Sequence, residues 1–186
     1  MDCTMEERAQ RIIAACLQTA SRDPLEIFEQ TARQDFVRMH GPEHHILDGA
    51  CLLTAYSNAG GRIELEPALR QLMAEGLRMP GAMCGLWGVC GAVSSVGAAL
   101  AIIEQTGPLT ADGSWESHME YTSSALKALS QIGGPRCCKR DGFTALLTAA
   151  DYVSRRYRIQ LTVHPVTCSF YPQNAQCLGS KCPYHP

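Results

Sequence analysis

Apolar residues recur every three to four positions through most of this 186-residue chain. Ile12, Ile13 and Cys16 share one helical face near the N-terminus, and Leu69 and Leu72 share another further along. This spacing is typical of amphipathic helices, and only one run, "RIQLTVHP", reads as extended. We therefore predict an all-α, single-domain bundle of about seven helices. The predicted helices lie within residues 5–20, 23–39, 45–61, 64–79, 90–107, 114–134 and 141–157.

The pattern ends after Pro165. The remaining segment, "TCSFYPQNAQCLGSKCPYHP", has too few aliphatic side chains to form a core of its own. We divide the chain into a helical domain, residues 1–165, and an irregular Cys-rich tail, residues 166–186, docked on it. A bound metal or contacts with the helices must hold such a tail in place.

Charge and polarity exclude some partners. A net charge of −2 and a pI near 6.3 argue against binding to nucleic acid or to an anionic membrane surface. The uncharged stretch from Met79 to Ile103 is rich in glycine, which favours a closely packed buried helix over a membrane span. The N-terminal "MDCTMEERAQR" lacks the apolar core of a secretory signal, so we expect a cytoplasmic protein.

The chain contains ten cysteines. In a reducing compartment these indicate metal binding or thiol chemistry rather than a disulfide framework. Cys3, Cys16 and Cys51 lie in or beside apolar helical patterns and are interpreted as plain core or surface residues. The other seven lie beside glycine, proline or basic residues.

Three motifs each precede a predicted helix: "HGPEHH", "CGLWGVCGAV" and "GGPRCCKRD". Free backbone N–H groups and the helix dipole favour anions at such positions. A thiolate there is expected to have a lowered pKa, and nearby basic side chains lower it further. Arg136, Lys139 and Arg140 would thus stabilise thiolates on Cys137 and Cys138, or an anionic cluster or substrate beside them.

The candidate roles follow from these motifs. Cys137 and Cys138 are candidate reactive thiols, and Glu43 and His44 are candidate general acids or bases. The candidate cofactor- or substrate-binding residues are His40, Arg136, Lys139 and Arg140. Plainer interpretations stay open, because Cys84 and Cys90 also suit small core positions, and "HGPEHH" also suits a capped turn with solvated histidines.

The tail has the clearest ligand pattern. Cys168, Cys177, Cys182 and His185 follow the spacing C-x8-C-x4-C-x2-H. Three cysteines and one histidine form a closed structural zinc set, and cysteines followed by proline also suit an Fe–S cluster. Thiolates serve both metals, so the sequence does not choose between them. The full set of predicted metal ligands is Cys84, Cys90, Cys137, Cys138, Cys168, Cys177, Cys182 and His185.

Taken together, "HGPEHHILDGACLLTA", "MPGAMCGLWGVCGAV", "GGPRCCKRD" and "CPYHP" resemble an uncharacterised cysteine-rich domain family of anaerobic bacteria and archaea. Its members are similar to modules found alone or fused to radical-SAM or methyltransferase-like domains. The resemblance spans roughly residues 38–186. It implies a redox or metal-linked role and supplies no catalytic residues.

From these features we expect cysteines of several loops to converge on one Fe–S or zinc centre near three helix N-termini. One hypothesis is an enzyme that carries out redox or sulfur chemistry on a small anionic substrate, or with a redox partner protein. The alternative is a non-catalytic binding module whose zinc only fixes the tail. An open coordination position would favour the first, and a closed Cys3His set the second.

Overall fold

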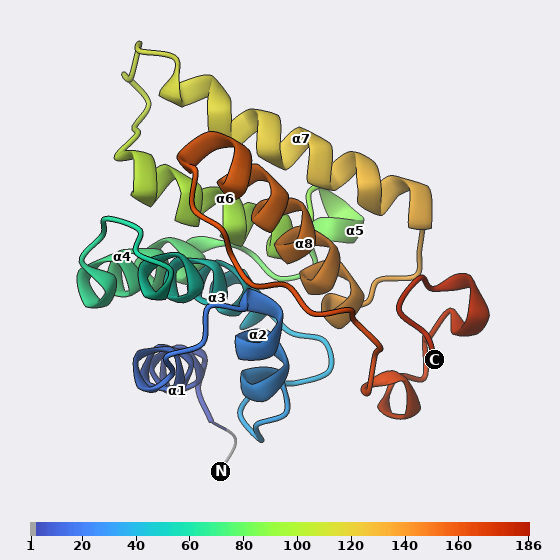
Figure 1. Ribbon diagram of the computed structural model, residues 1–186. Coiled ribbons are helices and arrows are strands. Elements are labelled where there is room, and N and C mark those ends of the chain that lie inside the picture. The colour runs from blue at the N-terminus through green and yellow to red at the C-terminus, as the bar shows by residue number, and fades with distance from the viewer. Residues whose placement is uncertain (1–2) are drawn as a thin grey trace.

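The computed structural model describes residues 3–186, and within that range it is all helical with no β-strand (Figure 1). The all-α prediction is confirmed, with eight α-helices in the described residues where about seven were expected. They are α1 (Met5–Gln18), α2 (Pro24–Ala32), α3 (His44–Asn58), α4 (Leu65–Arg78), α5 (Met83–Leu86), α6 (Gly91–Glu104), α7 (Ser114–Ile132) and α8 (Cys138–Tyr157). Two short 3₁₀ turns, η1 (Tyr171–Gln173) and η2 (Gly179–Lys181), lie in the tail.

Helix α3 forms the centre of the core, and every residue from His44 to Tyr56 is buried. Helix α6 packs closely against it through small side chains, as the glycine- and alanine-rich sequence indicates. A Cβ atom at Gly49 would collide with the carbonyl oxygen of Ser95, and Ser95 Oγ accepts a hydrogen bond from Gly49 N at 2.9 Å. Small residues at the contact therefore allow the two backbones to approach each other.

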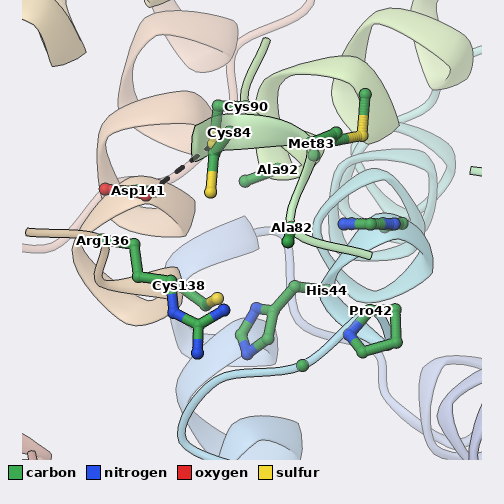
Figure 2. A pocket seen from close by; sticks show the side chains of 13 residues that line it. Pro42, His44, Ala82, Met83, Cys84, Cys90, Ala92, Arg136, Cys138 and Asp141 are labelled. Atoms are coloured by element: carbon green, nitrogen blue, oxygen red, sulfur yellow. Dashed lines mark hydrogen bonds between the residues drawn. The ribbon is translucent and has the colours of Figure 1, made fainter. Parts of the chain in front are cut away.

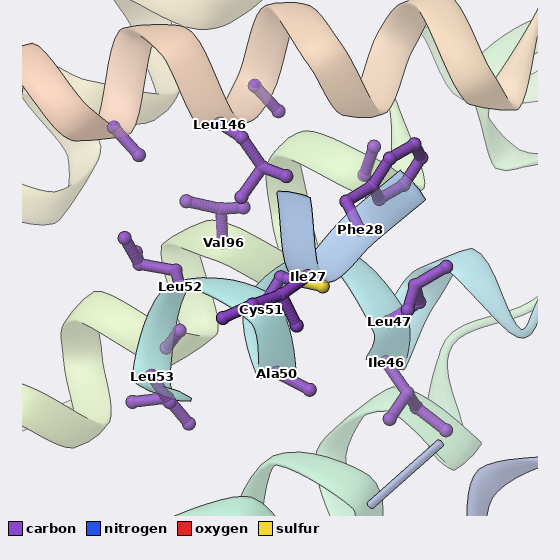
Figure 3. Packing of buried hydrophobic residues seen from close by; sticks show 14 of the residues in the cluster. Ile27, Phe28, Ile46, Leu47, Ala50, Cys51, Leu52, Leu53, Val96 and Leu146 are labelled. Carbon is purple, nitrogen blue, oxygen red and sulfur yellow. The ribbon is translucent and has the colours of Figure 1, made fainter. Parts of the chain in front are cut away.

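The rest of the core is built around these two helices (Figure 3). Phe28 of α2, Val96 of α6 and Leu146 of α8 surround the apolar face of α3, and all are fully buried. Cys16 and Cys51 are also fully buried among apolar side chains, as expected of plain core cysteines.

Several helix ends follow the sequence signals. Asp23 caps α2 by accepting hydrogen bonds from Leu25 N and Glu26 N, and Pro24 occupies the first helical position. Helix α2 nevertheless ends at Ala32, so the expected extension to residue 39 is wrong.

Tertiary contacts use the backbone groups beyond Ala32 instead. Phe36 O accepts a hydrogen bond from the Arg8 guanidinium at 2.6 Å, and Arg38 N donates to the Glu43 carboxylate at 2.7 Å. Together with turn bonds such as Val37 N to Gln34 O at 3.0 Å, they satisfy part of the backbone that a longer helix would have paired.

The uncharged stretch from Met79 to Ile103 is not one helix. It contains the short helix α5, which the periodicity did not predict, and the first thirteen residues of α6. Within residues 3–186 no helix combines the length and apolarity that a bilayer crossing requires.

After α8 the chain turns back on itself. Residues 158–165 form an extended strap without strand pairing, tied to the start of α2 by Thr162 N to Arg22 O at 3.1 Å. The strap returns the tail to the N-terminal end of α8 (Figure 1). There the rings of Phe170 and Tyr184 pack against Phe143, with centroid separations of 6.4 and 5.4 Å.

The strap ends in an ion pair between His164 and the carboxylates of Asp23 and Glu29. His164 Nδ1 lies 2.7 Å from Asp23 Oδ2, and His164 Nε2 lies 3.6 Å from Glu29. Partial burial acts to lower the pKa of His164, but the hydrogen bond and charge of Asp23, with the charge of Glu29, outweigh it and raise the pKa. The stabilisation from this pair is therefore complete below pH ~6.5 and is lost as the pH rises through the raised folded-state pKa.

As the pH rises above ~6.5, the unfolding free energy of the wild type should fall because His164 loses its charge. We expect His164→Gln to make this fall shallower. The effect should be less than about 1 kcal/mol, since the His164 side chain is 38% exposed and the pair is screened by water. Urea unfolding at several pH values measures this, with His118→Gln as the matched control. Equal pH slopes in wild type and His164→Gln would contradict the prediction.

Candidate functional site

The three helix-start motifs meet at the N-terminal end of α8. They enclose a small cavity of about 60 Å³, which we call the helix-start pocket. Its chemically active lining is Cys84, Cys90, Cys138, His44, His45 and Asp141, with Arg136 also on its wall. Figure 2 shows the labelled side chains of this pocket converging from the starts of α3 and α8 and from the α5–α6 segment. The predicted residues Cys84, Cys90, Cys138 and His44 are thus brought together.

Cys137 does not line this pocket. It lines a second cavity of about 20 Å³, the tail pocket, together with Cys168, Cys177, Cys182, Asn174 and His185. The two adjacent cysteines diverge because α8 begins between them. Cys137 is the N-cap in an extended conformation, with φ −148° and ψ 100°, and Cys138 is the first helical residue. The structure therefore divides the eight predicted ligands between two neighbouring pockets.

The thiols of the tail pocket accept several hydrogen bonds. Cys137 Sγ accepts from Arg140 N at 3.5 Å and from Asn174 Nδ2 at 3.4 Å. Cys177 Sγ accepts from Gly179 N at 3.4 Å. Such N–H···S bonds favour the thiolate form and tune sulfur-ligated clusters.

His185 occupies the outer part of the tail pocket. Its ring lies 4.7 Å from that of Tyr171, and its Nδ1 lies 3.0 Å from Pro186 O. All ten cysteines are free thiols. In the described part of the chain, no three Cys, His, Asp or Glu side chains are gathered so that they could hold a metal ion as they stand. Metal binding at either pocket therefore remains a prediction that requires the thiols to turn toward one another.

The expected lowering of thiol pKa values at the start of α8 is wrong. Burial raises the pKa of Cys138 to about 12, and the charge of Asp141 adds to this effect, while Gly41 N–H and Lys139 oppose it. Burial also raises the pKa values of Cys137 and Cys90. Desolvation of the thiolate thus outweighs the basic residues and the helix terminus. These thiols are protonated at neutral pH unless a metal or another cation binds them.

Beneath the pockets lies a buried polar chain. Lys139 Nζ lies 3.0 Å from His44 Nε2 and donates to Arg38 O at 2.9 Å. His44 Nδ1 lies 3.3 Å from Asp48 Oδ2, in an orientation that makes no hydrogen bond. Burial lowers the pKa of Lys139 to about 8 and raises that of Asp48 to about 8. Burial, with the charge of Lys139, holds the pKa of His44 well below its usual value, so the imidazole is neutral.

Glu43 is wholly buried beside this chain and does not line either pocket. Its carboxylate accepts hydrogen bonds from the backbone N, Nε and Nη2 of Arg38. Burial acts to raise the pKa of Glu43, but the bonds from Arg38 outweigh it and lower the pKa. The ionised side chain closes the "HGPEHH" turn.

His40 belongs to the tail side. Its Nε2 lies 3.1 Å from Asn174 Oδ1, and Asn174 Nδ2 donates to Cys137 Sγ. The sequence analysis missed Asn174, which stands in an irregular segment without a pattern to mark it. It also missed Asp48 and Asp141. Asp48 had a usable signal, because it follows His44 by four residues on an otherwise apolar helix face.

The basic residues of "GGPRCCKRD" differ in exposure. Lys139 and Arg140 are 1% and 5% exposed, and the Arg140 guanidinium donates to Asp141 at 3.0 Å and to Pro135 O at 3.1 Å. Arg136 is exposed and makes no ion pair with any carboxylate of the described residues. The three cations predicted to act together thus have separate tasks.

A family model places this arrangement among known sequences. The model of a family of unknown function, DUF5714, matches residues 12–185. The chain belongs to the DUF5714 family. No curated protein and no solved structure matches it. Both pockets lie within the part of the chain that the DUF5714 match covers, so the site belongs to the family domain itself.

The position of α8 against α3 depends on Gly142. A Cβ atom there would lie 2.7 Å from the Phe28 ring and closer still to Asp48 Oδ1, and both side chains are fully buried. We expect Gly142→Ala to lower the unfolding free energy by about 1–3 kcal/mol. Gly85→Ala, where a Cβ meets nothing within 4 Å, should change it by less than ~0.5 kcal/mol. Denaturant unfolding compares the two, and equal values would show that α8 is not held this closely.

Proposed function

We propose that this protein binds a thiol-ligated metal centre, an Fe–S cluster or zinc, in the tail pocket. The observation that carries the proposal is that Cys137, at the start of α8, lines one pocket with three cysteines of the tail, Cys168, Cys177 and Cys182. A four-thiol set from two separate segments suits both tetrahedral zinc and an Fe–S cluster. The bound centre would neutralise thiolates that burial otherwise disfavours.

The tail itself supports this assignment. Its regular structure is limited to two three-residue 3₁₀ turns, and its large buried apolar anchor is Phe170. Small segments of this kind often gain their order from a metal, since ligand binding and folding are then coupled. The N–H groups that point at the tail sulfurs are already in place to stabilise a charged centre.

We further propose that Cys84, Cys90 and Cys138 in the helix-start pocket carry out redox or sulfur chemistry on a small anionic substrate or with a redox partner protein. Arg136 on the pocket wall would attract the anion. This role fits the cytoplasm and anaerobic metabolism, where thiols stay reduced. It also fits the resemblance to modules fused to radical-SAM or methyltransferase-like domains.

The second candidate is a binding module whose zinc only fixes the tail. The four thiols of the tail pocket favour it, because they can fill all four coordination positions of zinc and leave none open. The visible spectrum separates the two metals, since an Fe–S cluster is brown and zinc is colourless.

Metal content tests the proposal directly. Protein purified without oxygen is expected to contain iron with sulfide, or zinc, in a fixed ratio to the chain. Cys168→Ser, Cys177→Ser and Cys182→Ser should each lose most of it, because each removes a thiolate ligand. Cys3→Ser, the same chemical change outside both pockets, should retain it. Elemental analysis with a visible spectrum measures this, and a metal-free wild type or equal contents in all variants would refute the proposal.

The fourth ligand is a separate prediction. Cys137 lines the pocket between two hydrogen-bond donors, and His185 is engaged with Tyr171 and Pro186 at its edge. We expect Cys137→Ser to lose the metal and His185→Gln to retain it. Elemental analysis of the two variants decides whether Cys137 or His185 is the fourth ligand beside the three tail cysteines. Retention in Cys137→Ser with loss in His185→Gln would restore the Cys3His set that the tail spacing suggests.

A further inference from the structure

A larger groove opens onto the helix-start pocket. It has a volume of about 630 Å³ and runs between α5 and the C-terminal half of α7. The two cavities share Cys84, Cys90, Arg136 and Asp141, so the pocket is the inner end of the groove. The volume lies in the range of about 300–1,000 Å³ that is typical of small-molecule sites.

The groove is apolar along its length. Leu126 and Leu129 of α7 and Leu86 of α5 line it, and Leu86 is 75% exposed. Several apolar side chains along one groove suit contact with the apolar body of a ligand.

The charges at the inner end favour an anion. Asp141 is the one carboxylate that lines either cavity among the described residues, and Arg140 holds it in an ion pair. Cys90 also donates to Asp141 at 3.8 Å. Arg136, which forms no ion pair with a carboxylate of residues 3–186, lines both cavities where they join. The fixed charge available to a ligand at this junction is therefore positive.

Two imidazoles add polar groups to the inner end of the groove. His44 and His45 both line the helix-start pocket, and the Nδ1 atom of each is buried without a hydrogen bond. His44 Nδ1 faces Asp48 Oδ2 at 3.3 Å. Buried polar atoms without partners are rare in native proteins and commonly await a ligand or water. A polar group bound in this pocket would lie beside the two imidazoles and the three thiols that line it.

We propose that the groove binds a small organic carboxylate with an apolar body. Its carboxylate pairs with Arg136 at the junction, beside Cys84, Cys90 and Cys138, and its apolar body lies along Leu126, Leu129 and Leu86. One guanidinium offers a planar, two-bond match to a carboxylate, whereas a dianionic phosphate would draw on more cations than this junction supplies. This inference names the substrate class of the proposed thiol chemistry, but the binding itself does not depend on a metal.

The test compares two probes of matched shape, octanoate and 1-octanol, by isothermal titration calorimetry on the full chain. Octanoate is expected to bind at least tenfold more tightly than 1-octanol. Arg136→Gln should weaken octanoate about tenfold, which corresponds to ~1.4 kcal/mol, and leave 1-octanol unchanged. Arg62→Gln, a matched change at an exposed arginine outside the groove, should alter neither.

A second pair of measurements locates the apolar body and tests the head group. Leu129→Ser should weaken both probes, and octyl phosphate should bind no more tightly than octanoate. Equal affinity for octanoate and 1-octanol, or octanoate binding that Arg136→Gln leaves intact, would overturn the proposal. Tenfold tighter binding of octyl phosphate would overturn the carboxylate assignment in favour of an organic phosphate.

The same titrations on protein of measured metal content separate this inference from the proposed function. Arg136-dependent octanoate binding in a chain that contains no metal would refute the metal centre and support the groove. A metal-loaded tail with equal affinities for octanoate and 1-octanol would support the metal centre and refute the groove proposal.

Discussion

The burial of the Lys139 ammonium group is the interaction on which the rest of the site depends. An ammonium ion removed from water needs partners, and it finds them in His44 and in the carbonyl oxygen of Arg38. Its Nζ also lies 5.3 Å from the centroid of the Phe170 ring in the tail. One side chain therefore joins the start of α8 to the start of α3 and to the returning tail.

The start of α8 also separates the thiols. Cys137 is the extended N-cap and Cys138 the first helical residue, so the two side chains are directed toward different cavities. The tail then supplies three further cysteines to one side, and the α5–α6 segment supplies two to the other. A single helix start thus contributes one thiol to each of two different cavities. One is a small cavity under the tail, and the other opens into a groove.

Much of this was accessible from the sequence, and the reasons are local. The helices follow from apolar spacing, the start of α2 from Asp23 and Pro24, and the close approach of α3 and α6 from small residues. The meeting of Cys84, Cys90 and Cys138 followed from their shared place before helices.

The division between the two pockets did not follow, because it depends on where α8 begins to within one residue. Sequence patterns fix helix ends only to within a few residues, and the pattern here placed this start at Asp141 rather than at Cys138. The raised thiol pKa values did not follow either, since burial is a property of the whole fold. Asn174 gave no signal because its role comes from contacts with His40 and Cys137, distant in the chain.

The bridge made by Asn174 fixes the protonation of a ring. Its amide nitrogen donates to Cys137, and its amide oxygen already accepts from Gln176 N at 3.0 Å, so the oxygen is the atom that faces His40. His40 Nε2 must then carry the hydrogen, because an oxygen acceptor requires a donor. Burial lowers the pKa of His40, which keeps the ring neutral. The tautomer is thereby settled, and the buried Nδ1 atom of His40 presents a lone pair, the form in which an imidazole acts as a Lewis base.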